Sequence, residues 1–139
     1  MNTELELKRQ EIIALVTWRD EERGTMLNKL LTNYKDLTLD ELATLEYLIR
    51  NNDDELVVLA LDMYQDIDVL ESLLDNSYEG KYDDRKEWAY ELFCQTYDED
   101  ENIPRNYIDL DFFLKELRYD YVILAGRATH YIFRNSYFP

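Results

Sequence analysis

The sequence predicts a mainly α-helical protein with a small α+β carboxy-terminal part, a helical bundle followed by helices packed on a short β-hairpin. Only three glycines and two prolines occur among 139 residues, too few for a turn-rich sheet protein. Apolar residues recur at helical spacing through most of the chain. Near the carboxyl terminus, β-branched and aromatic residues gather around a glycine instead, which is typical of strands.

The amino-terminal part, residues 1–36, is expected to be helical. A first helix is predicted over 3–23, with Gly24 near its end as a helix-terminating residue. A short second helix is predicted over 25–35.

Residues 37–77 are expected to form an acidic helical bundle. The sequence "TLDE", from Thr38 to Glu41, matches a capping box, in which both side chains bond free backbone N–H groups of a helix start. The helix that it opens stops near "RNND" and carries its apolar residues on one stripe: Leu42, Leu45, Leu48 and Ile49. A further helix starts around Asp53, with a break near Asp66, and its apolar stripe comprises Leu56, Leu59, Ala60, Met63 and Ile67.

Residues 78–139 are expected to form a small α+β domain. It begins with "YEGKYDD", which is predicted to be a connecting turn made by Gly80. An amphipathic helix follows over 84–97.

The end of the chain is predicted to hold a helix and a hairpin. Asp109 is a plausible N-cap for the helix. Two strands, at about Tyr121–Leu124 and His130–Arg134, are expected to be joined by a turn at Gly126.

The net charge of −16 is unevenly distributed. Residues 1–35 hold six acids and six bases, whereas residues 36–120 hold 25 acids and seven bases. Such a segment repels itself when it folds, so its acidity indicates a use beyond stability, although a solubilising surface is the simpler alternative. The charge excludes direct nucleic-acid binding, which requires the opposite sign.

The sequence contains few residues in the arrangements that catalysis or metal binding requires. Asp98, Asp100 and Asn102 have the alternate spacing of a calcium loop, but the glycine and glutamate that such a loop needs are absent. His130 is the single histidine and Cys94 the single cysteine, and both are expected to be structural. We therefore expect no enzyme, no cofactor and no metal.

The compartment expected from the sequence is the cytoplasm. The single cysteine cannot form a disulfide within the chain, so nothing in the sequence requires an oxidising compartment. The longest apolar run, "LVVLAL", is too short to span a membrane, and "MNTELELK" lacks the pattern of a signal peptide.

The acids of the middle segment fall on helical stripes. Neighbours four apart on a helix lie about 6 Å apart along its axis, comparable to the roughly 3.4 Å rise between phosphates of one DNA strand. Such stripes could imitate a phosphate ladder, or they could be the solvated faces of an acidic protein. The candidate acidic surface comprises Asp62, Asp66, Asp68, Glu71, Asp75, Glu79, Asp83, Asp84, Glu87, Glu91, Asp98, Glu99, Asp100 and Glu101.

The order of several short segments resembles the ArdA-type antirestriction proteins. These segments are "YEGKYDD", "IP", "YIDLDFFLKEL", "YDYVILAG" and "YIFRN", and the resemblance covers about residues 40–135. The matching residues are Tyr78, Gly80, Trp88, Ala89, Asp109, Phe113, Leu117, Tyr131, Phe133 and Arg134. Residues 1–36 depart from the family pattern, which has a further small amino-terminal domain there.

The resemblance implies a DNA mimic from phages or mobile elements that evades host defence. Such an inhibitor is an elongated acidic homodimer in the DNA-binding groove of a type I restriction–modification enzyme, inside the bacterial host cell. The family's dimer contact is carboxy-terminal, which points to aromatic residues that could equally be core: Tyr121, Tyr131, Phe133, Tyr137 and Phe138.

Two alternatives stay open. The same acidic chemistry would fit an anti-CRISPR inhibitor, because CRISPR effectors also have basic channels. In the other, the chain is a protein-interaction module without mimicry, with residues 1–36 as its contact.

Overall fold

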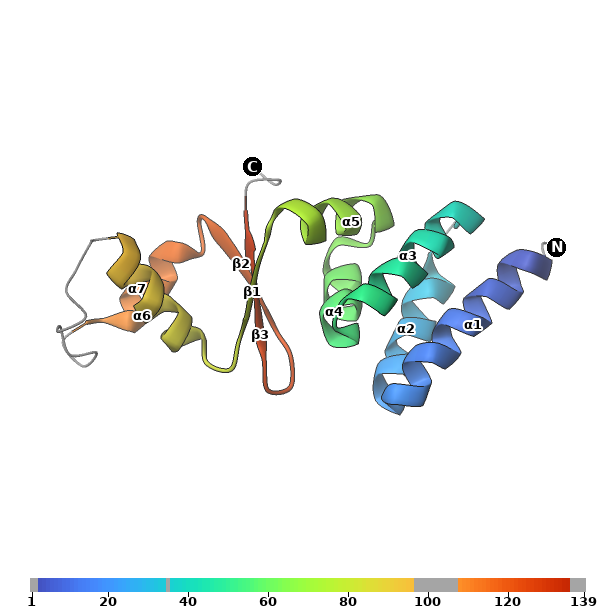
Figure 1. The fold of residues 1–139 in the computed structure, drawn as a ribbon, viewed down its shortest axis with the longest axis horizontal. Helices are drawn as coiled ribbons and strands as arrows, with labels where there is room; N and C mark the ends of the chain where they lie inside the picture. Colours follow the sequence, from blue (N-terminus) through green and yellow to red (C-terminus); the bar gives the residue numbers. More distant parts are fainter. Residues whose placement is uncertain (1–2, 35, 97–107, 136–139) are drawn as a thin grey trace. The chain divides into compact units, whose positions relative to one another are not determined.

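The structure is a computed structural model that describes residues 3–34, 36–96 and 108–135 (Figure 1). The chain divides into two compact units, Met1–Asp75 and Asn76–Pro139, here called unit 1 and unit 2. The described part is mainly helical, with a small antiparallel sheet near the carboxyl terminus, which confirms the predicted fold class.

Unit 1 is built from helices that are each set by local sequence signals. They are α1 (Thr3–Arg19), α2 (Glu21–Asn33), α3 (Leu39–Asn51), α4 (Asp54–Tyr64) and α5 (Ile67–Asn76), the last of which ends just past the unit boundary. Helix α1 packs against α2 and α3, while α2 also packs against α4. The predicted segments 1–36 and 37–77 therefore share one unit up to residue 75 instead of forming separate bodies.

The first helix ends earlier than the sequence pattern predicts. The Asp20 side chain accepts the backbone N–H of Arg23 at 3.1 Å and so caps the start of α2. Gly24 then lies inside α2 and not at a helix end, so that prediction was wrong. An added Cβ at Gly24 would lie 2.0 Å from Thr17 Oγ1, which means that this glycine permits close packing of α2 on α1.

The capping box at the start of α3 is confirmed. The Glu41 backbone N–H donates to Thr38 Oγ1 at 3.1 Å, and the Thr38 backbone N–H donates to Glu41 Oε1 at 3.2 Å. The predicted break near Asp66 is also confirmed, because α4 ends at Gln65 in a left-handed conformation, with φ of 51°.

The core of unit 1 follows the predicted stripes closely. All four predicted apolar residues of α3 are buried, and α4 and α5 bury Leu56, Ala60, Ile67, Leu70 and Leu73 among others. Two predicted residues of α4 are exceptions, because Leu59 is only half-buried and Met63 is 54% exposed.

Over its described residues, unit 2 combines a three-stranded antiparallel sheet with two helices. Its elements are β1 (Tyr78–Tyr82), α6 (Arg85–Thr96), α7 (Leu110–Leu117), β2 (Tyr121–Ala125) and β3 (His130–Arg134). The strand order is β1-β3-β2, so β3 is central. The predicted hairpin is confirmed, as is Asp109 as N-cap, whose Oδ1 accepts the Phe112 N–H at 3.1 Å.

Strand β1 was predicted to be a connecting turn, and this prediction was wrong. The segment pairs with β3, and the register shifts between Tyr78 and Gly80, where φ is 136°. Gly80 thus supplies an unusual backbone conformation in a bulged strand instead of a turn. The half-buried Tyr78, Gly80 and Tyr82 alternate with the exposed Glu79 and Lys81, a period of two that indicates a strand.

Helices α6 and α7 cover one face of the sheet. Trp88 and Ala89 from α6 pack with Leu110 and Leu117 from α7 and with Ile132 of the central strand. The outer strands add Tyr82, Tyr121 and Ile123 to the margin of this core.

Candidate functional site

Five acids of the candidate surface lie in unit 1. Asp62 is on α4, Asp66 precedes α5, and α5 itself carries Asp68, Glu71 and Asp75. All are exposed except Glu71, which is half-buried. The spacing of three and four residues on α5 aligns its acids on one helical stripe, away from the side that the helix buries.

Asp66 has a structural role in this group. Its Oδ1 accepts the Val69 N–H at 3.1 Å, and its carbonyl accepts the Leu70 N–H at 3.0 Å. It is therefore the N-cap of α5. The side chains of the other four acids bond to no residue that the structure describes.

Five further acids lie in unit 2, and all are exposed. Glu79 is on β1, Asp83 and Asp84 lie between β1 and α6, and Glu87 and Glu91 are on α6. The remaining predicted acids, Asp98, Glu99, Asp100 and Glu101, lie outside the described residues, as does Asn102 of the calcium-like spacing.

Three of the unit 2 acids hold the fold together. Glu79 Oε1 pairs with Arg134 Nε at 2.7 Å and so links β1 to β3. Asp84 Oδ1 accepts the Lys86 N–H at 2.8 Å, at the start of α6. Burial raises the pKa of Tyr82, and the Glu91 carboxylate raises this pKa further by Coulomb interaction and by accepting the phenol's hydrogen bond.

Six acids remain that make no such contact, here called the unpaired acids. They are Asp62, Asp68, Glu71, Asp75, Asp83 and Glu87. A single exposed ion pair contributes little affinity. A set of unneutralised carboxylates nevertheless creates a negative potential that attracts a basic surface and accepts hydrogen bonds from its lysines and arginines.

Other acids of unit 1 are neutralised inside the protein by bases of the charge-balanced residues 1–35. Lys8 Nζ lies 2.9 Å from Glu46 Oε1, and this hydrogen bond lowers the pKa of Glu46. Arg23 Nη2 lies 3.6 Å from Glu55 Oε2. The first pair joins α1 to α3, and the second joins α2 to α4. These bases therefore neutralise acids that lie outside the candidate surface.

The most buried ion pair of this network joins Arg19 to Asp54. Arg19 Nη1 lies 2.7 Å from Asp54 Oδ1, and the Asp54 side chain is only 4% exposed. Its other oxygen, Oδ2, has no hydrogen-bond partner. Burial raises the pKa of Asp54, and the Arg19 guanidinium opposes this rise.

The aromatic residues predicted to form a dimer contact differ in how far they are exposed. Tyr131 is 1% exposed and Phe133 is fully buried, so neither side chain is available to a second folded copy. The Phe133 ring packs against that of Tyr78 at 5.3 Å. Tyr121 is half-buried, with its ring 5.1 Å from Trp88, whereas Tyr137 and Phe138 lie outside the described residues.

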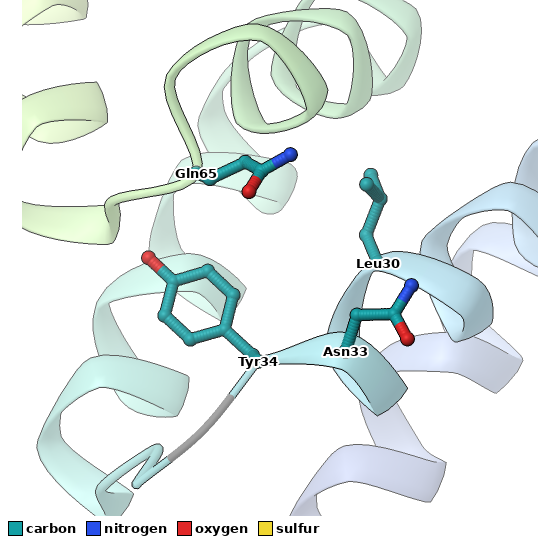
Figure 2. A pocket seen from close by; sticks show the side chains of 4 residues that line it. All are labelled: Leu30, Asn33, Tyr34 and Gln65. Carbon is teal, nitrogen blue, oxygen red and sulfur yellow. The ribbon is translucent and has the colours of Figure 1, made fainter.

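A pocket of about 260 Å³ opens in unit 1 where α2 and α4 end (Figure 2). Leu30, Asn33 and Tyr34 line it from the end of α2, and Gln65 lines it from the end of α4. Figure 2 shows these four side chains around one opening, with the two amides and the phenol supplying its polar atoms.

The electrostatics of this pocket suit a cation. Neither α2 nor α4 has a basic residue in its last turn, so no cation in these two turns offsets the negative ends of their helix dipoles. Burial raises the pKa of Tyr34, opposed by the Ile67 N–H that bonds to the phenol oxygen. Nearby carboxylates raise this pKa further: Asp66, Glu41 and Asp68. An ammonium or guanidinium group would find acceptors here.

Sequence reasoning did not find this pocket. Its geometry depends on the left-handed Gln65, which no pattern in the sequence indicates. The signal that was present is the lack of lysine and arginine in "LLTN" and "LDMY", the last turns of the two helices.

The described residues offer no cluster of metal ligands. No group of three or more histidine, cysteine, aspartate or glutamate side chains among them could hold a metal ion. His130 lies on β3 with a buried Nδ1 that has no hydrogen-bond partner, and Cys94 is a half-buried free thiol on α6.

Within the described part of the chain, no helix is both long and apolar enough to cross a lipid bilayer.

Comparisons with known proteins add no identification. No protein-family model matches the chain, and no curated protein and no solved structure shows significant similarity to it.

Proposed function

We propose that the chain is a non-enzymatic inhibitor that presents carboxylates in place of phosphates to a basic DNA-binding groove. The target favoured by the antirestriction resemblance is a type I restriction–modification enzyme of a bacterial host. The protein would compete with the DNA duplex without binding nucleic acid itself.

The observation that carries the proposal is the division between paired and unpaired acids. Lys8, Arg19 and Arg23 are used on acids that join the helices of unit 1. The α5 acids Asp68 and Asp75 are exposed and pair with no base among the described residues. If acidity served only folding, neutralising partners would be expected on this stripe as well.

The cation pocket at the ends of α2 and α4 supports the same reading. A basic groove carries lysine and arginine side chains, and one of them would find amide and phenol oxygens beside Tyr34 and Gln65. Charge-assisted hydrogen bonds of this kind are roughly twice as strong as neutral ones.

The direct test is competition between this protein and labelled duplex DNA on a purified type I enzyme. The key variant neutralises the α5 stripe with Asp68→Asn, Glu71→Gln and Asp75→Asn. The matched control removes the same charge elsewhere with Glu4→Gln, Glu21→Gln and Asp40→Asn, which are exposed positions outside the candidate surface. The stripe variant should displace DNA much more weakly than the control variant.

Salt provides a second criterion. Exposed charges are screened beyond about 10 Å at 0.1 M salt, so affinity should fall steadily as salt rises. Affinity that is insensitive to salt, or equal losses from the stripe and control variants, would refute mimicry by this surface. Displacement of DNA from a CRISPR effector but not from the restriction enzyme would transfer the proposal to an anti-CRISPR role.

One observation favours the alternative of a protein-interaction module. Trp18 on α1 is 90% exposed and Leu7 on the same helix is 59% exposed, within the charge-balanced amino-terminal segment. Exposed aromatic side chains are frequent anchors of protein interfaces. In that case Trp18→Ala would abolish activity, while the α5 stripe variant would remain active.

A further inference from the structure

A second pocket lies in unit 2 and has the opposite character to the rest of the protein. It is an open depression of about 560 Å³, a volume within the range of small-molecule sites, and lies beside α6, α7 and β2. Three basic residues line it, Arg85 from α6 and Lys115 and Arg118 from the end of α7. In a protein of net charge −16, this concentration of bases around one cavity is unexpected.

Among the residues that the structure describes, little compensates the positive charge of this basic pocket. The one acidic residue of its described lining, Asp111, pairs with Lys86 at 3.3 Å, which offsets the Asp111 charge. Arg85 and Lys115 form no ion pair with any residue in the described ranges. Arg118 donates a weak hydrogen bond to the Tyr119 hydroxyl at 3.4 Å, lies 5.3 Å from the centre of the same ring, and interacts electrostatically with Glu116.

Helix dipoles explain only part of this arrangement. Lys115 and Arg118 lie at the carboxyl end of α7, where cations are favourable. Arg85 occupies the first position of α6, where the positive end of the dipole disfavours a cation. A stability argument therefore leaves Arg85 unexplained, whereas an anion in the pocket would be stabilised by all three side chains.

The remaining wall of the basic pocket is apolar and aromatic. Leu114 comes from α7, and Tyr121 and Ile123 come from the edge strand β2. All three are half-buried, so each leaves part of its side chain accessible. A ligand that bears an apolar ring next to an anionic group would contact both halves of the pocket.

We propose that the basic pocket binds a small phosphate monoester with an aromatic or apolar part. Two guanidinium groups and one ammonium group carry three positive charges, which more than offset the two negative charges of a phosphate dianion, and the guanidinium fork fits two of its oxygens. The apolar part lies against Leu114, Tyr121 and Ile123. None of the acids of the candidate surface lines this pocket, and phosphate binding here does not depend on the proposed inhibitor function.

The test uses the full chain and three probes: phenyl phosphate, inorganic phosphate and phenol. Titrations followed by amide chemical shifts should give saturable changes at Leu114 and Ile123 with phenyl phosphate. Inorganic phosphate should bind more weakly because it lacks the ring, and phenol should give no saturable change.

Variants separate a site from general attraction between charges. Lys115→Gln removes one charge from the pocket, and Lys29→Gln removes the same charge from an exposed position on α2. Loss of one charge-assisted hydrogen bond should weaken phenyl phosphate binding about tenfold in Lys115→Gln and leave Lys29→Gln unchanged. Thermal unfolding of both variants should match that of the unmodified chain, because both side chains are exposed.

Three results would overturn the inference. They are the absence of saturable binding of phenyl phosphate, equal weakening by both lysine variants, and equally tight binding of benzoate. The last would show that the pocket selects a carboxylate, such as an acidic peptide side chain, instead of a phosphate monoester.

Discussion

Replacing Arg19 by glutamine tests whether the buried acid of unit 1 depends on its single close base. The substitution removes the guanidinium that lies 2.7 Å from Asp54 Oδ1 and leaves a carboxylate that is only 4% exposed. Breaking a buried ion pair costs about 3–5 kcal/mol when both partners are buried. Arg19 is itself 45% exposed, so water can enter after its removal, and we expect a loss of about 2–3 kcal/mol.

The neutral partner variant separates the burial of a charge from the loss of a contact. In the double variant Arg19→Gln, Asp54→Asn, no charge remains buried, so most of the lost stability should return. The matched control is Arg50→Gln, because Arg50 forms an exposed pair with Glu46 at 3.7 Å within α3. That pair should contribute no more than about 0.5 kcal/mol.

The pH dependence of stability gives an independent check on Asp54. Burial raises its pKa in the folded state above the ordinary value of 3.8. The folded protein therefore binds this proton more tightly, and its contribution to stability is present below that value and lost as pH rises through the folded pKa. Asparagine does not titrate, so the stability of Asp54→Asn relative to the unmodified chain should increase as pH rises through this interval.

Urea denaturation at several pH values, followed by circular dichroism, measures all of these variants. In thermal unfolding, the expected loss for Arg19→Gln corresponds to roughly 10–20 °C if unit 1 unfolds on its own. The reasoning fails if Arg19→Gln costs no more than Arg50→Gln, or if the double variant is no more stable than Arg19→Gln.

Three further predictions concern backbone features, and each is measured by the urea midpoint. Gly24→Ala should cost about 1–3 kcal/mol, because its Cβ would lie 2.0 Å from Thr17 Oγ1; a neutral result would mean that α1 and α2 separate easily. Gly80→Ala should also cost about 1–3 kcal/mol, but through its φ of 136°, since nothing lies within 4 Å of the added Cβ. Restoration of Gly80→Ala by enlarging space around it would contradict this distinction. Thr38→Ala should cost about 0.5–2 kcal/mol by removing the capping box of α3, and an equal loss in a Thr38→Ser control would argue against the hydroxyl as the cause.

The helices of unit 1 could be predicted because their signals are local. The capping box at Thr38 and the leucine stripe of α3 lie within a few residues of each other. The boundary between α1 and α2 was harder, since Gly24 fits both a helix end and a close helix contact. Only the position of Thr17 across the interface decides between these.

Strand β1 could not be predicted from its own residues as the helices of unit 1 could. Five residues around a glycine are as compatible with a turn as with a strand, and the partner that settles the matter is β3, about fifty residues later. The alternation of Tyr78 and Tyr82 with Glu79 was the one local signal, and it became informative only once pairing with β3 was known.

The candidate surface was predictable in exposure but not in the role of each acid. Which acids hold the fold depends on partners from elsewhere, as when Glu79 meets Arg134 across the sheet and Glu91 meets Tyr82. The basic pocket was missed for the same reason, because Arg85 and Lys115 come together only through the packing of α6 and α7.

The placement of the bases explains how so acidic a chain can fold and still keep free carboxylates. Lys8, Arg19 and Arg23 act within unit 1 at acids that join helices, where each pair replaces repulsion by attraction. No base in the described part of the chain pairs with the α5 stripe, so the mutual repulsion of its carboxylates persists in the folded protein. Neutralising that stripe should therefore stabilise the protein at low salt while weakening any basic partner's binding. If these acids were retained for folding, neutralising them would instead destabilise the protein. The stability of this one variant therefore distinguishes the two roles.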